Sequence, residues 1–119
     1  MAVDPGSYRA GWRARYAAEQ AALAVRHKRA WRVARLAARL LKEQFGATRV
    51  ALFGSTLHQD RFTPWSDVDI AVWGLAPADT FKAVAAVTWL DEEIAVDMVD
   101  VTTCRPAVRA VIEHESVAL

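Results

Sequence analysis

The chain has 119 residues, of which 54% are hydrophobic and 24% are charged, so it fits one compact domain with a modest core. The single cysteine, Cys104, excludes an internal disulfide framework, and no apolar run approaches the roughly 20 residues that span a bilayer. We therefore expect a cytoplasmic protein without a membrane segment.

The net charge of +1 hides an uneven distribution along the chain. Residues 1–49 contain eleven lysines and arginines against three acidic residues, whereas residues 50–119 contain four against eleven. A basic segment can bind an acidic partner or nucleic acid, but a solvated helix face is its commonest explanation. Direct binding of nucleic acid is not expected.

The first 45 residues are typical of a helix. From Ser7 to Phe45 there is no proline, Gly11 is the only glycine, and alanine, leucine and arginine dominate. This composition predicts a long helix, or two in sequence, with Ser7 as N-cap and Gly46 as the residue that ends it. The helical segment is predicted to be an N-terminal extension, residues 1–45, to a catalytic core at residues 46–119 within one domain.

Two predicted strands follow. The short apolar segment Arg49–Phe53 runs directly into Gly54-Ser55, which indicates a buried strand that ends in a tight turn. A polar loop, residues 56–66, leads to a second strand, Asp67–Trp73, whose alternation places Asp67 and Asp69 on one face.

The remaining segments complete an α/β (α+β) domain with helices packed on a small mixed sheet. The expected elements are a helix at residues 78–90, a third strand at residues 94–101 and a last helix at residues 107–115. In the first of these helices, the apolar residues expected to face the sheet are Phe81, Val84, Ala85 and Trp89.

The turn and the second strand suggest a site for a nucleoside triphosphate and Mg²⁺. Glycine lets a phosphate approach the backbone at Gly54, and the Ser55 hydroxyl and nearby N–H groups can donate to its oxygens. Asp67 and Asp69 supply the oxygen ligands that Mg²⁺ prefers. A third carboxylate would help to hold a second ion in a two-metal arrangement.

The motif F-G-S-T-x₁₀-D-V-D-I at residues 53–70 resembles the minimal nucleotidyltransferases of the DNA polymerase β superfamily. The resemblance implies that fold, nucleotide contacts at Gly54 and Ser55, and metal binding at Asp67 and Asp69. It also implies a third acidic residue on a later strand. That strand offers Asp97 and Asp100, whose odd spacing points them to opposite faces, and we favour Asp97.

The resemblance further implies a function. Minimal members of the family are similar to the antitoxin halves of toxin–antitoxin modules, in which the enzyme transfers AMP from ATP to a tyrosine of a HEPN-domain ribonuclease with the help of Mg²⁺. Many relatives carry Arg-Gly where this chain has His58-Gln59, so an antitoxin that only binds its toxin is the alternative, and transfer to a small molecule ranks third. A homo- or hetero-oligomer is compatible with the sequence.

Overall fold

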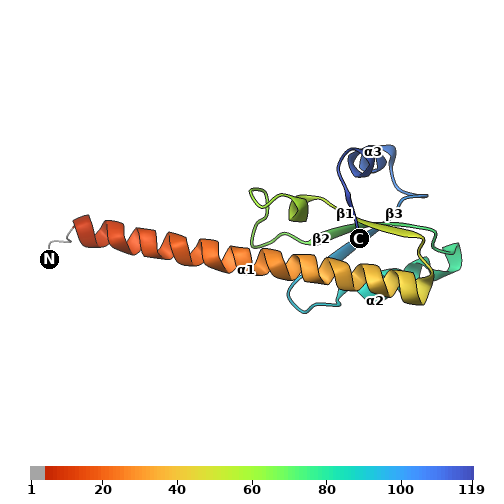
Figure 1. Cartoon of the computed structure of the whole chain (residues 1–119), viewed down its shortest axis with the longest axis horizontal. Coiled ribbons are helices and arrows are strands. Elements are labelled where there is room, and N and C mark those ends of the chain that lie inside the picture. Colours follow the sequence, from red (N-terminus) through yellow and green to blue (C-terminus); the bar gives the residue numbers. More distant parts are fainter. Residues whose placement is uncertain (1–4) are drawn as a thin grey trace.

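A single straight helix dominates the molecule, for which a computed structural model describes residues 5–119 (Figure 1). Helix α1 runs from Pro5 to Phe45 without interruption, so the alternative of two successive helices is wrong. The helix begins at Pro5, since proline is well tolerated in a first turn. Ser7 therefore lies inside the first turn and is not the N-cap that the sequence predicted. Gly46 ends the helix in a left-handed conformation with φ 67°, as predicted.

The sheet has four strands in the order β3-β2-β1-β4. Strand β1 (Arg49–Phe53) pairs antiparallel with β2 (Val68–Trp73) and with the short β4 (Val117–Ala118), which the sequence did not predict. Strand β3 (Val96–Asp100) lies parallel to β2, because the chain crosses over through helix α2 (Thr80–Thr88). Helix α3 (Pro106–His114) follows β3. The predicted mixed α/β fold is confirmed.

Helices cover both faces of this sheet (Figure 1). The C-terminal half of α1 and helix α2 share the main core with one face, and α3 packs against the other face around Phe53, Ala71, Val101 and Ile112. The buried α1 residues in the main core are Ala30, Val33, Ala34, Ala37, Ala38 and Leu41. The division of the chain into an extension up to residue 45 and a core from residue 46 stays a prediction. The second half of α1 packs in the same core as the sheet.

Helix α2 presents the opposite face from the one predicted. Ala83 and Val87 are buried against the sheet and α1, whereas Phe81 is 89% exposed and Trp89 70% exposed. Apolar residues occur on most sides of the helix, where Lys82 is the one charged residue, so its periodicity did not select a buried face. The small side chains allow the closer approach. The large apolar side chains consequently point to solvent. Among residues 5–119 no helix has the length and apolar character needed to cross a membrane.

Candidate functional site

Gly54 forms a sharp turn where β1 ends. Its φ of 83° and ψ of −160° suit glycine alone, and residues Ser55–Leu57 follow as one turn of 3₁₀ helix. A Cβ built on Gly54 would overlap Oδ2 of Asp69 and lie 3.1 Å from its Cγ. The Asp69 carboxylate therefore packs directly against the Gly54 backbone, and any side chain at residue 54 would displace it.

Asp67 and Asp69 lie at the start of β2, next to this turn. Strand β2 begins at Val68, one residue later than predicted, so Asp67 immediately precedes it. Val68, Ile70 and Val72 are buried in the main core, which leaves Asp69 on the opposite face with Ala71. The alternation predicted from the sequence is confirmed.

The register of β3 decides which of its aspartates lies beside Asp69. In the parallel pair, Asp69 is the direct partner of Asp97, so both side chains leave the sheet on the same face. Asp100 has the opposite parity, and its Oδ1 accepts hydrogen bonds from the backbone N–H and the hydroxyl of Thr102, at 3.0 and 2.7 Å. Asp97 therefore joins Asp69, and Asp100 stabilises the turn after β3.

The three carboxylates influence one another electrostatically. Burial first, then the charge of Asp97 and then that of Asp67, raise the pKa of Asp69 from 3.8 to about 6. Asp67 and Asp97 are exposed, whereas Asp69 is half-buried beside Gly54. Among the described residues, no basic side chain lowers the pKa of Asp69. Negative charge is therefore concentrated at this site. Within the described part of the chain, no three His, Cys, Asp or Glu side chains converge closely enough to hold a metal ion unaided.

Two residues that the sequence analysis did not select hold the turn after Gly54 in place. Thr56 is fully buried, and its hydroxyl donates to the Asp67 carbonyl at 3.3 Å, so it ties the Gly54 turn to the start of β2. His27 on α1 bonds the Thr56 carbonyl through Nε2 at 2.7 Å and packs its ring on Phe62. A histidine within a basic helix gave no sequence signal for this contact.

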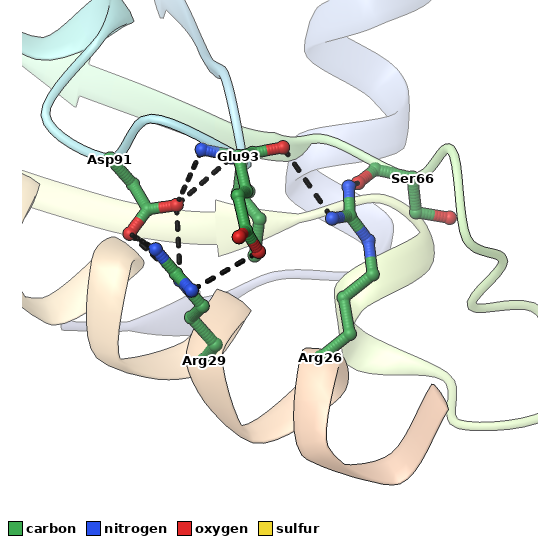
Figure 2. A network of polar contacts seen from close by, with 6 residues as sticks. Arg26, Arg29, Ser66, Asp91 and Glu93 are labelled. Atoms are coloured by element: carbon green, nitrogen blue, oxygen red, sulfur yellow. Dashed lines mark hydrogen bonds and ion pairs between the residues drawn. The ribbon is translucent and has the colours of Figure 1, made fainter. Parts of the chain in front are cut away.

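Two arginines of α1 anchor the chain segments that lead into β2 and β3 (Figure 2). Arg26 donates to the carbonyls of Ser66 and Glu93, at 3.2 and 3.4 Å. Arg29 makes a forked contact with Asp91, 2.9 Å from Nε to Oδ1, and reaches the Glu93 carboxylate at 3.1 Å. Burial disfavours ionisation of Asp91, but the hydrogen bond from Arg29 and those from two backbone N–H groups outweigh it and lower its pKa.

His58 lies in the loop between β1 and β2, beside the end of α3. Its ring is half-buried and forms an ion pair with Glu115, the residue that follows α3. Gln59 and Arg61 are exposed on the same loop. The interaction holds His58 at the α3 side of the loop.

The family follows from a match that spans most of the chain. Residues 34–117 match the family model described as a nucleotidyltransferase domain, a range that includes all five predicted site residues. The chain belongs to the nucleotidyltransferase domain family. The match begins inside α1, where the helix enters the core of this domain.

One solved structure similar to this nucleotidyltransferase domain is described as a crystal structure of a toxin–antitoxin with AMP-PNP. It superposes with a TM-score of 0.55 at 21% sequence identity, over 67% of this chain and 66% of the solved chain, just under two thirds of its length. At that identity the comparison shows a shared fold. No curated protein matches the chain.

Proposed function

We propose that the chain is a Mg²⁺-dependent nucleotidyltransferase that transfers AMP from ATP to a tyrosine hydroxyl of a HEPN-domain toxin, and so acts as an antitoxin. The observation that carries the proposal is the register of β2 and β3, which sets Asp97 beside Asp69, the carboxylate that packs against Gly54. Membership of the nucleotidyltransferase domain family supplies the reaction class.

The residues fit Mg²⁺ bound together with a triphosphate. Mg²⁺ is usually held by one or two protein carboxylates, with phosphate oxygens and water completing its octahedron. Asp67, Asp69 and Asp97 would hold two such ions. The ions would neutralise these carboxylates, among them Asp69, whose pKa is raised first by burial and then by the charges of Asp97 and Asp67. When bound, the metal would neutralise the triphosphate and favour departure of pyrophosphate.

The turn after β1 would position the nucleotide. Gly54 leaves no side chain between the backbone and an approaching phosphate, and Ser55 offers its hydroxyl at the first position of the 3₁₀ turn. His27 and Thr56 fix this turn relative to the start of β2. One connected group of hydrogen bonds would then fix the position of the nucleotide-binding turn relative to the carboxylates.

The antitoxin role is supported by the solved toxin–antitoxin chain of the same fold, together with the motif resemblance at residues 53–70. The HEPN identity of the toxin and the tyrosine acceptor rest on the resemblance. Transfer to a small molecule is the less favoured outcome, because the described residues do not form a second domain that would complete an acceptor pocket.

One observation favours a second candidate, an antitoxin that neutralises its toxin by binding alone. His58 lies in the loop where many relatives place an arginine, and its ring forms an ion pair with Glu115. The ring is therefore less available to a triphosphate. Weak or absent transfer chemistry would follow if that loop cannot hold the nucleotide.

A labelling experiment separates the two candidates. The purified chain is mixed with the protein encoded beside it, Mg²⁺ and ATP labelled on the α-phosphate. Transfer predicts label on the partner, lost when Mg²⁺ is chelated and in the double variant Asp67→Asn, Asp69→Asn. The matched control is Asp60→Asn, which removes one exposed loop carboxylate outside the site and should leave labelling intact.

Toxin neutralisation is measured on the same variants. If the double variant still neutralises the toxin and the wild-type chain transfers no label, the binding candidate is correct and the transferase proposal is wrong. A thermal-shift measurement adds a readout that needs no acceptor, because ATP with Mg²⁺ should raise the melting temperature of the wild type and not of the double variant.

A further inference from the structure

The N-terminal part of α1 extends beyond the domain as a free arm, defined here as residues 8–18 (Figure 1). Every residue of the arm is exposed, and the molecule measures 67 Å along its longest axis against 27 and 20 Å across. Helices of this length have little stability in water by themselves, because most helical stability in proteins comes from packing of an apolar face. The arm therefore has the features of an element that packs on another surface.

The arm carries an aromatic stripe on one side. Tyr8, Trp12 and Tyr16 follow one another at four-residue intervals and are 60%, 55% and 63% exposed. Residues four apart lie on one side of a helix, and the Tyr8 and Trp12 rings touch edge to face with centroids 6.4 Å apart. At 3.6 residues per turn, this stripe continues the side of α1 that is buried at Ala30, Ala34 and Ala37. The side that is covered in the domain is thus uncovered in the arm.

A second uncovered apolar surface lies on α2. Phe81 and Val84 lie on its outer side, opposite the buried Ala83 and Val87, and the exposed Trp89 follows at its C-cap. Contiguous exposed apolar surface marks sites of interaction with other proteins. Helix α2 has nine residues, as does the arm stripe from residue 8 to residue 16, so each extends about 12 Å at 1.5 Å per residue.

The arm and the segment that follows α2 carry opposite charge. Residues 8–18 include three arginines and no acidic residue. Residues 79–93 include four acidic residues and one lysine, and two of the four, Asp91 and Glu93, pair with Arg29 of the same chain. Glu92 is exposed at the end of the α2 surface, and the Glu93 side chain is 63% exposed although it contacts Arg29. An arm lying on this surface would place its arginines near those carboxylates.

The arm cannot reach the α2 surface of its own chain. Helix α1 is continuous, α2 packs beside its C-terminal half, and the arm points away from both (Figure 1). We infer that the occupant is a second copy of this chain, so that each arm packs on the α2 of its partner in a two-fold symmetric dimer. The exchange covers both surfaces at once and closes without leaving either available for a third copy.

Sedimentation velocity of the full chain over a range of concentrations tests this inference without reference to activity. The wild type should have about twice the chain mass of 13.2 kDa. Trp12→Ser and Phe81→Ser should each shift the protein toward monomer. Loss of a well-packed aromatic side chain weakens an interface by about tenfold or more, and two symmetric contacts make the change in dissociation constant about a hundredfold.

A matched control and a mixing experiment make the geometry specific. Val111→Ser removes an exposed apolar side chain from α3, on the other side of the sheet, and should leave the dimer unchanged. Trp12→Ser mixed with Phe81→Ser should recover dimer relative to either variant alone, because the mixed dimer contains one intact contact between a wild-type arm and a wild-type α2. Tyr16→Ser and Trp89→Ser form an independent pair with the same expectation.

Three results would overturn the inference. A wild type that stays monomeric at its highest soluble concentration would exclude a second copy of this chain as the occupant. A dimer that survives both Trp12→Ser and Phe81→Ser would place the interface elsewhere. Failure of the two variants to complement each other would exclude the exchange of arms.

Discussion

Replacing Asp69 by asparagine should stabilise the protein in the absence of metal, although it should abolish nucleotidyl transfer. The cause is the cost of ionising a half-buried carboxylate next to two others. Burial, Asp97 and Asp67 raise the pKa of Asp69 from 3.8 to about 6, which would oppose folding by about 3 kcal/mol at a pH well above 6 for a fully buried group, and by less here because solvent screens the half-buried carboxylate. Asparagine has nearly the same shape and carries no charge.

The sign of the effect depends on pH. Between pH 3.8 and about 6 the folded chain binds a proton at Asp69 that the unfolded chain has already released, so stability falls as the pH rises through this window. Below it the carboxyl is protonated in both states and the substitution changes little. Above it we expect a gain of about 1–3 kcal/mol, lower than the full cost because a partly buried amide also loses hydration.

Urea denaturation at pH 7.5 and pH 4, both with a chelator, measures this gain. Asp60→Asn is the control, since it removes an exposed carboxylate from the loop before β2. Adding ATP with Mg²⁺ at pH 7.5 should stabilise the wild type and leave Asp69→Asn unaffected. An Asp69→Asn chain that is less stable than the wild type at pH 7.5, or that gains equally at both pH values, would refute the electrostatic account.

Three further predictions concern the elements around the site. Gly54→Ala should cost about 1–3 kcal/mol of stability and abolish transfer. The control is Gly74→Ala, also at φ 83° and with its Cβ obstructed by Thr48, which should cost a similar amount of stability and leave transfer intact. Equal transfer in the two variants would contradict the role of Gly54. His27→Phe should keep the ring contact but lower the free energy of unfolding by about 1 kcal/mol in urea denaturation, with a raised KM for ATP, because the hydrogen bond to the loop is lost. Arg29→Met should destabilise the fold at pH 7, because the lowered pKa of Asp91 contributes stability only while that carboxylate is ionised. In thermal melts below about pH 4 the difference from wild type should shrink. A difference that persists in acid would contradict this account.

The elements that local chemistry specifies could be predicted from the sequence. A β-branched run before Gly54 indicates a strand with a turn, and alternation in residues 67–73 indicates which side chains share a face. The strict two-residue period of a strand predicted that only one of Asp97 and Asp100 can join the site, and the place of Asp97 inside the strand, between Val96 and Met98, favoured it. Whether Asp97 binds metal stays a prediction, while its place beside Asp69 follows from the parallel register.

Contacts between distant segments could not be predicted in this way. Apolar residues occur on most sides of helix α2, so periodicity did not select which face is buried, and the face chosen from large side chains was the exposed one. His27 and Arg29 belong to a basic helix whose members look alike in sequence. Only the packing of α1 on the sheet distinguishes those that reach the loops from those that face solvent.

The second half of α1 therefore has a direct bearing on the chemistry of the site. The segments that carry the three carboxylates are paired directly as β2 and β3. Burial first, and then the charges of Asp97 and Asp67, raise the pKa of Asp69, so the carboxylates repel one another. Arg26 contacts both segments, at the carbonyls of Ser66 and Glu93, and sits one residue from His27, which fixes the Gly54 turn through Thr56. The hydrogen bonds from the basic helix, made behind the site, thus add to the strand pairing that opposes this repulsion. For this reason the site should tolerate loss of the arm far better than loss of any one of these three α1 residues: Arg26, His27 or Arg29.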